Sequence, residues 1–342
     1  MKKKILALIL ACAMILALAA CSGSANTEQP AAEAPASDAA SATTETPAAE
    51  GKTYTVGVCQ LVQHEALDAA TQGFCDALTE ALGDAVTIDV QNASGDSVNC
   101  GTIVNGFVSK NVDLIMANAT PALTAAASAT ADIPILGTSI TAYGVALDIA
   151  DFSGTVGGNI SGTSDLADLA AQAQMILDWF PDTQKVGLLF CSAEPNSRYQ
   201  IEEVAKYLAD KGVETEEFAF TDTNDVASVT QSAADYADVV YIPTDNTAAA
   251  NTEAIGNVLI PAGVPAICGE EGICRGCGVA TLSISYYDLG VTTGKMAAKI
   301  LTGEANISEM PVEFTDATPK YNPSVCEQLG ITPLEGYEAI EG

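Results

Sequence analysis

A short apolar run at residues 239–242 stands directly before a cluster of helix-capping residues. The run is β-branched or aromatic throughout, which is typical of a buried strand. Pro243 ends it, because proline has no N–H to donate to a sheet. Residues 244–247 are of types that favour helix N-caps, and residues 248–255 have the composition of the helix that would follow. The stretch therefore predicts a strand leading straight into a helix. It puts Asp245 beyond the strand's carboxyl end, where open α/β sheets bind ligands.

Residues 112–129 repeat this arrangement. An apolar run comes first, Thr120 suits an N-cap, Pro121 suits the first helical position, and an alanine-rich run follows. Each copy continues into a second short strand next to a proline, at 133–136 and at 264–267. Two similar strand–helix units facing each other are the pattern of a protein whose ligand cleft lies between two lobes.

Short apolar strands and amphipathic helices alternate along the rest of the chain. This alternation predicts an α/β fold of two Rossmann-like lobes with parallel sheets, joined by a hinge of several strands. The pattern breaks around residues 157–161, which suits a crossing between lobes. We therefore predict that lobe 1 comprises 52–158 and 284–309, and that lobe 2 comprises 159–283 and 310–342.

The first 51 residues predict export and anchoring. Three lysines precede an uncharged apolar run at 5–20, which is typical of a signal peptide covering residues 1–20 and is short for a membrane span. Residues 18–21, Leu-Ala-Ala-Cys, resemble the bacterial lipobox, which implies a lipid on Cys21. Residues 21–51 are rich in Ser, Thr, Ala, Pro and Glu, which predicts a flexible tether. The alternative is an uncleaved signal anchor. We expect the protein at the extracytoplasmic face of a bacterial cell membrane.

The formal charge of −31 at pH 7 repels nucleic acid and anionic membrane surfaces, so no nucleic-acid partner is expected. Cys274 and Cys277 form a C-x-x-C motif. A zinc site would need more ligands than these and the distant His64, the chain's only histidine. The motif falls in a glycine-rich segment predicted to be a loop, whereas a redox role would want a helix start. A local disulfide or plain thiols are predicted, with no metal and no cofactor.

Six short motifs then stand in the order found in one family. The sequence resembles the substrate-binding lipoproteins of ABC importers, of the tryptophan/tyrosine type, over residues 53–330. The motifs lie at 64–70, 91–96, 119–122, 194–197, 243–247 and 286–290. The resemblance implies a type I periplasmic-binding-protein fold, a small ligand held between the lobes, often an aromatic amino acid, and delivery to an ABC permease with its ATPase. Residues 63, 65 and 138–143 depart from the family's usual pattern, which leaves the ligand's identity open.

An amino-acid ligand would need partners for one anion and one cation. Thr120, with Ala122 behind it, suits the carboxylate in lobe 1, because helix N-termini attract anions. The ammonium needs a desolvated carboxylate, for which Asp245 is the first choice and Glu194 the second. Tyr143, Tyr241 and Tyr286 could supply an aromatic wall. The predicted ligand-binding set is His64, Thr120, Ala122, Ser139, Glu194, Asn196, Ser197, Asp245, Asn246, Glu270 and Tyr286.

Simpler roles remain open for several of these residues. Thr120, Ser197 and Asp245 can be plain helix caps, contributing about 1 kcal/mol each. Tyr241 can belong to the core, and His64 can be a hydrogen-bonded loop residue.

Two other functions remain as alternatives. The same fold could bind a sugar, a nucleoside or another small molecule, or serve a sensor. Sugar sites often use arginine, and the folded part holds only Arg198 and Arg275. An enzyme is not predicted, because there is no G-x-S-x-G elbow, no G-x-G-x-x-G motif after a strand, and no second histidine. A monomer is expected.

Overall fold

A computed structural model describes residues 51–341. The predicted signal peptide, the lipidation site at Cys21 and the tether up to residue 50 lie outside the described residues. Within residues 51–341, no helix combines the length and the apolar character needed to cross a membrane.

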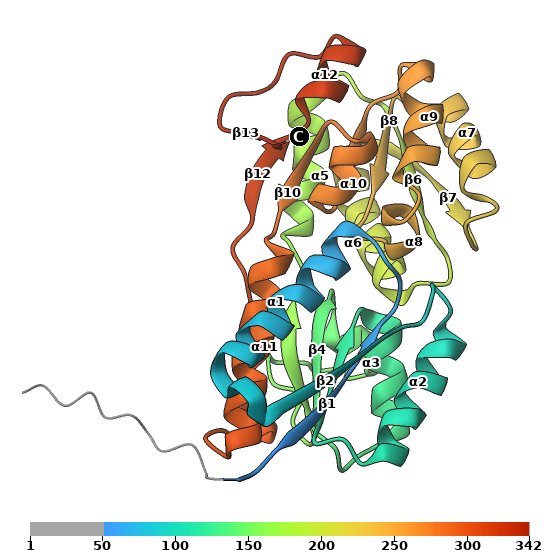
Figure 1. Cartoon of the computed structure of the whole chain (residues 1–342). Helices are drawn as coiled ribbons and strands as arrows, with labels where there is room; N and C mark the ends of the chain where they lie inside the picture. Colours follow the sequence, from blue (N-terminus) through green and yellow to red (C-terminus); the bar gives the residue numbers. More distant parts are fainter. Residues whose placement is uncertain (1–50, 342) are drawn as a thin grey trace, which may run out of the picture. The chain divides into compact units, whose positions relative to one another are not determined.

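The first lobe is built on a six-stranded parallel sheet with the strand order β11-β5-β4-β3-β1-β2 (Figure 1). Its strands are β1 (Tyr54–Gln60), β2 (Val86–Asn92), β3 (Leu114–Asn118), β4 (Ile135–Ile140), β5 (Ile160–Ser164) and β11 (Glu313–Phe314). Helices cover both faces. They are α1 (Glu65–Leu82) and α11 (Tyr286–Thr302) on one face, and α2 (Ser97–Lys110) and α3 (Thr120–Ala129) on the other, with the short α4 (Tyr143–Ala146) beside α3.

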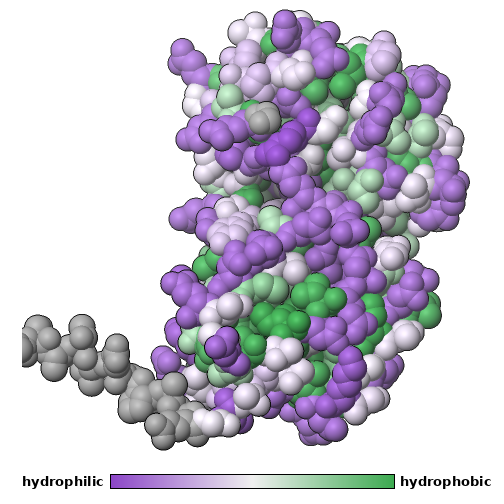
Figure 2. Space-filling view, in the orientation of Figure 1, coloured by the Kyte–Doolittle hydropathy of each residue, from purple (hydrophilic) through white to green (hydrophobic). Residues whose placement is uncertain are grey.

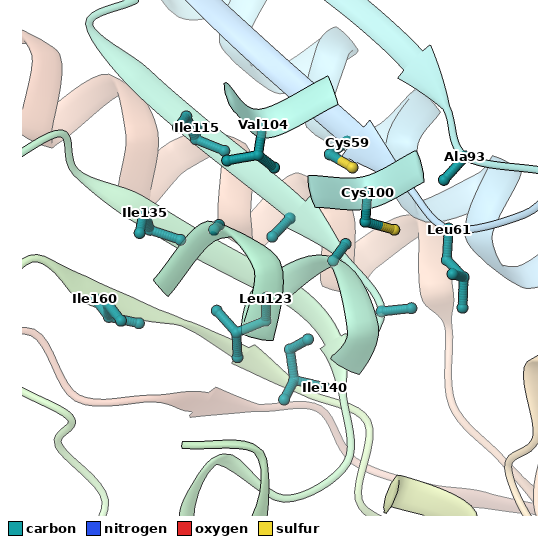
Figure 3. Packing of buried hydrophobic residues seen from close by; sticks show 14 of the residues in the cluster. Cys59, Leu61, Ala93, Cys100, Val104, Ile115, Leu123, Ile135, Ile140 and Ile160 are labelled. Atoms are coloured by element: carbon teal, nitrogen blue, oxygen red, sulfur yellow. The ribbon is translucent and has the colours of Figure 1, made fainter. Parts of the chain in front are cut away.

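Alternate residues of the buried strands supply two separate cores. Ile115 and Ala117 of β3 pack beneath α2 and α3, whereas Leu114 and Met116 pack against α1 and α11. Figure 3 shows the first of these cores, with Leu123 of α3 among the isoleucines of the sheet. Because side chains alternate along a strand, a run that is apolar throughout is what a sheet covered on both faces requires.

The second lobe has a seven-stranded sheet of order β13-β12-β10-β9-β8-β6-β7, parallel except where β10 pairs with β12. Its strands are β6 (Lys185–Cys191), β7 (Glu214–Phe220), β8 (Val239–Ile242), β9 (Ala266–Cys268), β10 (Ala280–Ser283), β12 (Thr318–Tyr321) and β13 (Glu338–Ala339). Packed on one face are α5 (Leu169–Trp179), α6 (Pro195–Asp210) and α12 (Pro323–Leu329); on the other are α7 (Val226–Tyr236), α8 (Asn246–Ala249), α9 (Thr252–Ala262) and α10 (Glu271–Cys277). Single 3-10 turns occur at Gly83–Ala85 and Ile307–Glu309.

The two-lobed α/β fold is therefore confirmed, but the crossing points differ from the predicted ones. The strand β5 pairs with β4, so lobe 1 continues to Ser164 instead of ending at 158. The pairing of β11 with β5 likewise keeps the chain in lobe 1 beyond residue 309, to Phe314. The break in pattern near 157–161 is a turn into β5 within lobe 1, made by Gly157 and Gly158 with φ of 81° and 59°. Local sequence shows that a turn is present, but only long-range pairing decides which sheet the next strand joins.

Two smaller predictions are also corrected. The single helix expected at 248–255 is two helices, because the side chain of Asn251 donates to the carbonyl of Thr247 at 2.7 Å and its backbone leaves the helical region. The C-x-x-C motif lies in helix α10, not in a loop, because the carboxylate of Glu270 caps that helix. Cys274 and Cys277 are buried, and all eight cysteines of the described residues are free thiols.

Candidate ligand-binding site

A narrow cavity lies between the lobes, where strands of both sheets end. It has room for about 10 Å³ of solvent, close to what one water molecule needs. A molecule larger than water could enter only if the lobes move apart. The cavity is lined by His64, Leu67, Ser139, Thr141, Asp165, Asn196, Thr244, Asp245, Asn246, Ala249, Glu270 and Tyr286. Seven of these belong to the predicted ligand-binding set, namely His64, Ser139, Asn196, Asp245, Asn246, Glu270 and Tyr286.

Strand direction explains why these residues meet. His64 follows β1, Asp165 follows β5, Asp245 follows β8 and Glu270 follows β9, so each lies beyond the carboxyl end of a parallel strand. The carboxyl ends of parallel strands meet at one edge of their sheet, and the two such edges face each other here.

Lobe 1 presents a strained backbone to this region. Ala119 and Ser139 have φ of 87° and 56°, which is unfavourable for residues other than glycine. The hydroxyl groups of Ser139 and Thr120 are buried and have no hydrogen-bond partner. Ser139 lines the cavity, whereas Thr120 does not. Ala122, also in the predicted set, packs in the core beneath α3 and stays away from the cavity.

Asp165 is the buried carboxylate that sequence reasoning missed. It is 4% exposed, and its Oδ2 accepts from Tyr286 Oη at 2.9 Å while its Oδ1 has no partner. Burial raises its pKa, against the opposing effect of the hydrogen bond from Tyr286. The available signal was an acid directly after residues 160–164, but that segment was not predicted to be a strand.

Glu194 is held entirely by lobe 2. Its Oε1 accepts from the N–H of Thr247 at 2.9 Å and from its hydroxyl at 2.8 Å. Its Oε2 accepts from the N–H of Asn246 at 3.0 Å and from its Nδ2 at 2.7 Å. Glu194 thus accepts hydrogen bonds from the first two residues of α8, and it does not line the cavity.

Both carboxylate oxygens of Asp245 are also hydrogen-bonded within lobe 2. They accept from the N–H groups of Cys191 at 2.6 Å and Ala248 at 2.8 Å. Burial, with the nearby charge of Glu194, raises the pKa of Asp245 to about 8. Both carboxylate oxygens of Asp245 and of Glu194 thus accept hydrogen bonds, whereas Oδ1 of Asp165 has no partner.

Asn196 and Ser197 open helix α6 on the lobe 2 side. The Nδ2 of Asn196 donates to the carbonyl of Thr244 at 3.1 Å, and its buried Oδ1 has no partner. Ser197 is buried beside it and does not line the cavity. Across the boundary, Nε2 of His64 lies 3.3 Å from Oδ1 of Asn246, and burial lowers the pKa of His64, which favours the neutral ring.

The remaining predicted residues are a cap and three tyrosines. Glu270 accepts from the N–H of Gly272 at 2.7 Å at the start of α10, and burial raises its pKa to about 7. Tyr286 lines the cavity, and its hydroxyl donates to Asp165. Tyr143 and Tyr241 are core residues whose hydroxyls donate to the Thr163 carbonyl at 3.2 Å and to Gln172 Oε1 at 2.5 Å. Neither of these two forms an aromatic wall.

Two Rossmann-like lobes joined by three connections, with a polar cavity between them, define a binding protein of the type I periplasmic fold. Residues 55–337 match the model of one family, described as ABC transporter substrate binding protein. The chain belongs to this family.

Three relatives are similar to the chain over most of its length. It is 33% identical over 270 residues to a protein of Clostridioides difficile (strain R20291) described as a tyrosine-binding protein, covering 78% of each chain. The crystal structure of a Streptococcus pneumoniae ABC domain in complex with L-Trp superposes with a TM-score of 0.80 at 31% identity, covering 84% of this chain and 100% of that one. A ligand-free, open substrate-binding protein from Clostridium difficile superposes with a TM-score of 0.64 at 32% identity, covering 84% and 99%. At nearly equal identity, this chain thus superposes more closely on the L-Trp complex than on the ligand-free, open structure.

Proposed function

We propose that this chain is an extracytoplasmic solute-binding lipoprotein of an ABC importer, which traps an amino acid between its lobes and delivers it to a permease with its ATPase. Family membership supports the transport role. The tyrosine-binding relative and the L-Trp complex support an amino acid, with aromatic ones first among the candidates. The lipobox-like residues 18–21 support a lipid on Cys21 and attachment to the membrane.

One observation carries the amino-acid proposal. Three buried polar atoms without partners belong to residues that line the cavity: Oγ of Ser139, Oδ1 of Asp165 and Oδ1 of Asn196. Leaving such atoms unpaired costs about 1–3 kcal/mol each, so a ligand that satisfies them is favoured. An ammonium group has three donors and no acceptor, which suits the two acceptors on Asp165 and Asn196. The hydroxyl of Ser139 can donate to a carboxylate.

Contacts with both lobes convert binding into closure. Ser139 belongs to lobe 1, Asn196 to lobe 2, and Asp165 directly follows the last residue of β5 at the hinge. A ligand that touches all three binds the closed arrangement better and shifts the population toward it. The permease can then recognise the closed surface, while a lipid and tether raise the protein's concentration near the membrane. We propose binding without catalysis.

A ligand other than an aromatic amino acid is the second candidate. It is favoured by the lining, in which Leu67 and Ala249 are the only aliphatic residues. A polar amino acid, a sugar or a nucleoside would each suit such walls.

Isothermal titration tests both candidates. The purified protein would be titrated with each of the twenty amino acids, with glucose and with adenosine. We expect binding of one or a few amino acids. Binding of a sugar or nucleoside with no binding of amino acids would overturn the assignment. Mass spectrometry of the membrane-bound protein and of a Cys21→Ala variant tests the lipid separately: a lipid mass on the first peptide is expected only when Cys21 is present.

A further inference from the structure

One ion pair joins the two lobes next to the cavity. Nη1 of Arg275 in α10 donates to Oε1 of Glu65 at the start of α1, and Nη2 donates to Oε1 of Glu271 at 2.7 Å. Oε2 of Glu271 also accepts from Nζ of Lys320 at 2.8 Å. Every other ion pair found in the described residues lies within a single lobe.

The pair connects two helices that begin at the ligand site. Glu65 directly follows His64, and α10 directly follows Glu270; His64 and Glu270 both line the cavity. Neither Glu65 nor Arg275 lines it. Because neither side chain lines the cavity, we attribute the effect of this pair on binding to the positions of the two lobes.

Acidic side chains crowd this boundary. Glu65 of lobe 1 and the lobe 2 residues Glu270 and Glu271 border one surface pocket, together with Asp288, Asp316 and Lys320. Burial first, and then the charges of Glu65 and Glu271, raise the pKa of Glu270, so these carboxylates interact across the boundary. The face in Figure 2 is mostly hydrophilic where the lobes meet. Among the ion pairs of the described residues, Arg275 bonds an acid of each lobe, Glu65 and Glu271, whereas Lys320 bonds Glu271 within lobe 2.

We propose that Arg275 is a positioning residue of the ligand site: it holds the lobes together by bonding Glu65 and by neutralising carboxylates that would otherwise repel each other across the boundary. A contact made only when the lobes are closed adds its free energy to closure and therefore to apparent affinity. This inference rests on the proposed function, in which closure traps the ligand.

Three variants separate bonding from neutralisation. Arg275→Gln removes the bond and exposes Glu65 to Glu270 and Glu271. We expect it to weaken binding of the best amino acid roughly three- to ten-fold, or about 0.7–1.4 kcal/mol. A partly exposed ion pair is lost, and like charges then face each other across the boundary. Glu65→Gln removes the bond together with one repelling charge, so its loss should be smaller. In the double variant Glu65→Gln/Arg275→Gln, affinity should recover to about the Glu65→Gln value. A role confined to folding would not produce this recovery.

A matched control exists within lobe 2. Arg198 pairs with Glu217, Nη1 to Oε2 at 2.6 Å, with side chains 39% and 47% exposed, against 37% and 56% for Arg275 and Glu65. Arg198→Gln should leave the affinity within two-fold of that of the unchanged protein. Raising ionic strength should reduce the difference between the unchanged protein and Arg275→Gln, because salt screens exposed charges.

A measurement without ligand keeps this inference separate from the proposed function. Small-angle X-ray scattering of the ligand-free protein at low salt should give a larger radius of gyration for Arg275→Gln than for the unchanged protein and Arg198→Gln. Equal radii together with equal affinities would refute the role of Arg275. If no amino acid binds the unchanged protein, the proposed function fails, and scattering alone decides about Arg275: a larger radius supports it and an unchanged radius refutes it.

Discussion

Asp165 is buried and its Oδ1 has no hydrogen-bond partner, so removing its charge should affect ligand binding more than folding. Asp165→Asn keeps the shape and loses the charge. We expect amino-acid affinity to fall by about 3 kcal/mol, because a buried ammonium would lose its counter-charge. The stability of the ligand-free protein should hold or rise, since the amide has a smaller desolvation cost. Calorimetric titration and thermal unfolding measure the two effects. The exposed Asp182→Asn is the control, and unchanged affinity of Asp165→Asn would exclude a direct contact.

Asp245 should behave differently, because its partners are backbone groups. Asp245→Ala leaves the N–H groups of Cys191 and Ala248 buried without acceptors. We expect a loss of about 2–4 kcal/mol in the free energy of unfolding, measured by urea denaturation. Asp245→Asn, which keeps one acceptor, should retain most of the affinity. If Asp245→Asn and not Asp165→Asn abolished binding, the ammonium partner would be Asp245.

At the scale of elements, the contact between α1 and α11 depends on glycine. A Cβ added at Gly290 would lie 2.0 Å from the carbonyl oxygen of Ala70, and one at Gly73 would lie 2.1 Å from that of Tyr287. These helices approach so closely that their backbones touch, with Tyr286 at the start of α11 reaching the cavity.

Gly290→Ala is therefore expected to destabilise the protein by about 1–3 kcal/mol through overpacking, as measured by urea denaturation. Gly101→Ala, within α2 with open space around it, should stabilise by up to about 1 kcal/mol, because alanine favours a helix. Equal effects of the two substitutions would show that helix propensity, and not the α1–α11 contact, dominates.

For the whole molecule, buried acids set the dependence of stability on pH. Burial raises the pKa of Asp245 from its usual 3.8 to about 8 and that of Glu270 from 4.5 to about 7. The folded state then binds protons more tightly than the unfolded chain. The stability from these groups is fully present below about pH 4 and is lost as pH rises through 7 to 8. The lowered pKa values of His64, Glu271, Asp89 and Asp238 act in the opposite direction. Asp89 and Asp238 are close to solvent and screened, and Asp165, whose pKa burial raises, adds to the effect of Asp245 and Glu270.

We therefore expect the free energy of unfolding to fall between pH 5 and pH 8, by an amount on the order of a few kcal/mol. Urea denaturation across this range measures it. Glu270→Gln should flatten the dependence between pH 5 and 7. A stability that increases with pH over the same range would contradict the direction assigned here.

Some residues of the site could be predicted from the sequence and others could not. The position of Asp245 beyond a strand could be predicted, because an apolar run, a proline and capping residues are all local. The same holds for His64, Asn196 and Glu270, each of which follows a strand and lines the cavity. Most of the α/β order of the fold could be predicted for the same reason.

Two features depended on contacts between distant segments. Asp165 joins the cavity because β5 pairs with β4 in lobe 1, a choice that no residue near 165 reveals. Cys191, Thr247 and neighbouring groups already donate to Asp245 and Glu194, which is why we propose Asp165 ahead of them as the ammonium partner. Local sequence thus determined the strand–helix order and which polar residues follow the strands. Only the tertiary structure decided which of those carboxylates keeps an oxygen without a hydrogen-bond partner, because that depends on every donor that folding brings within reach.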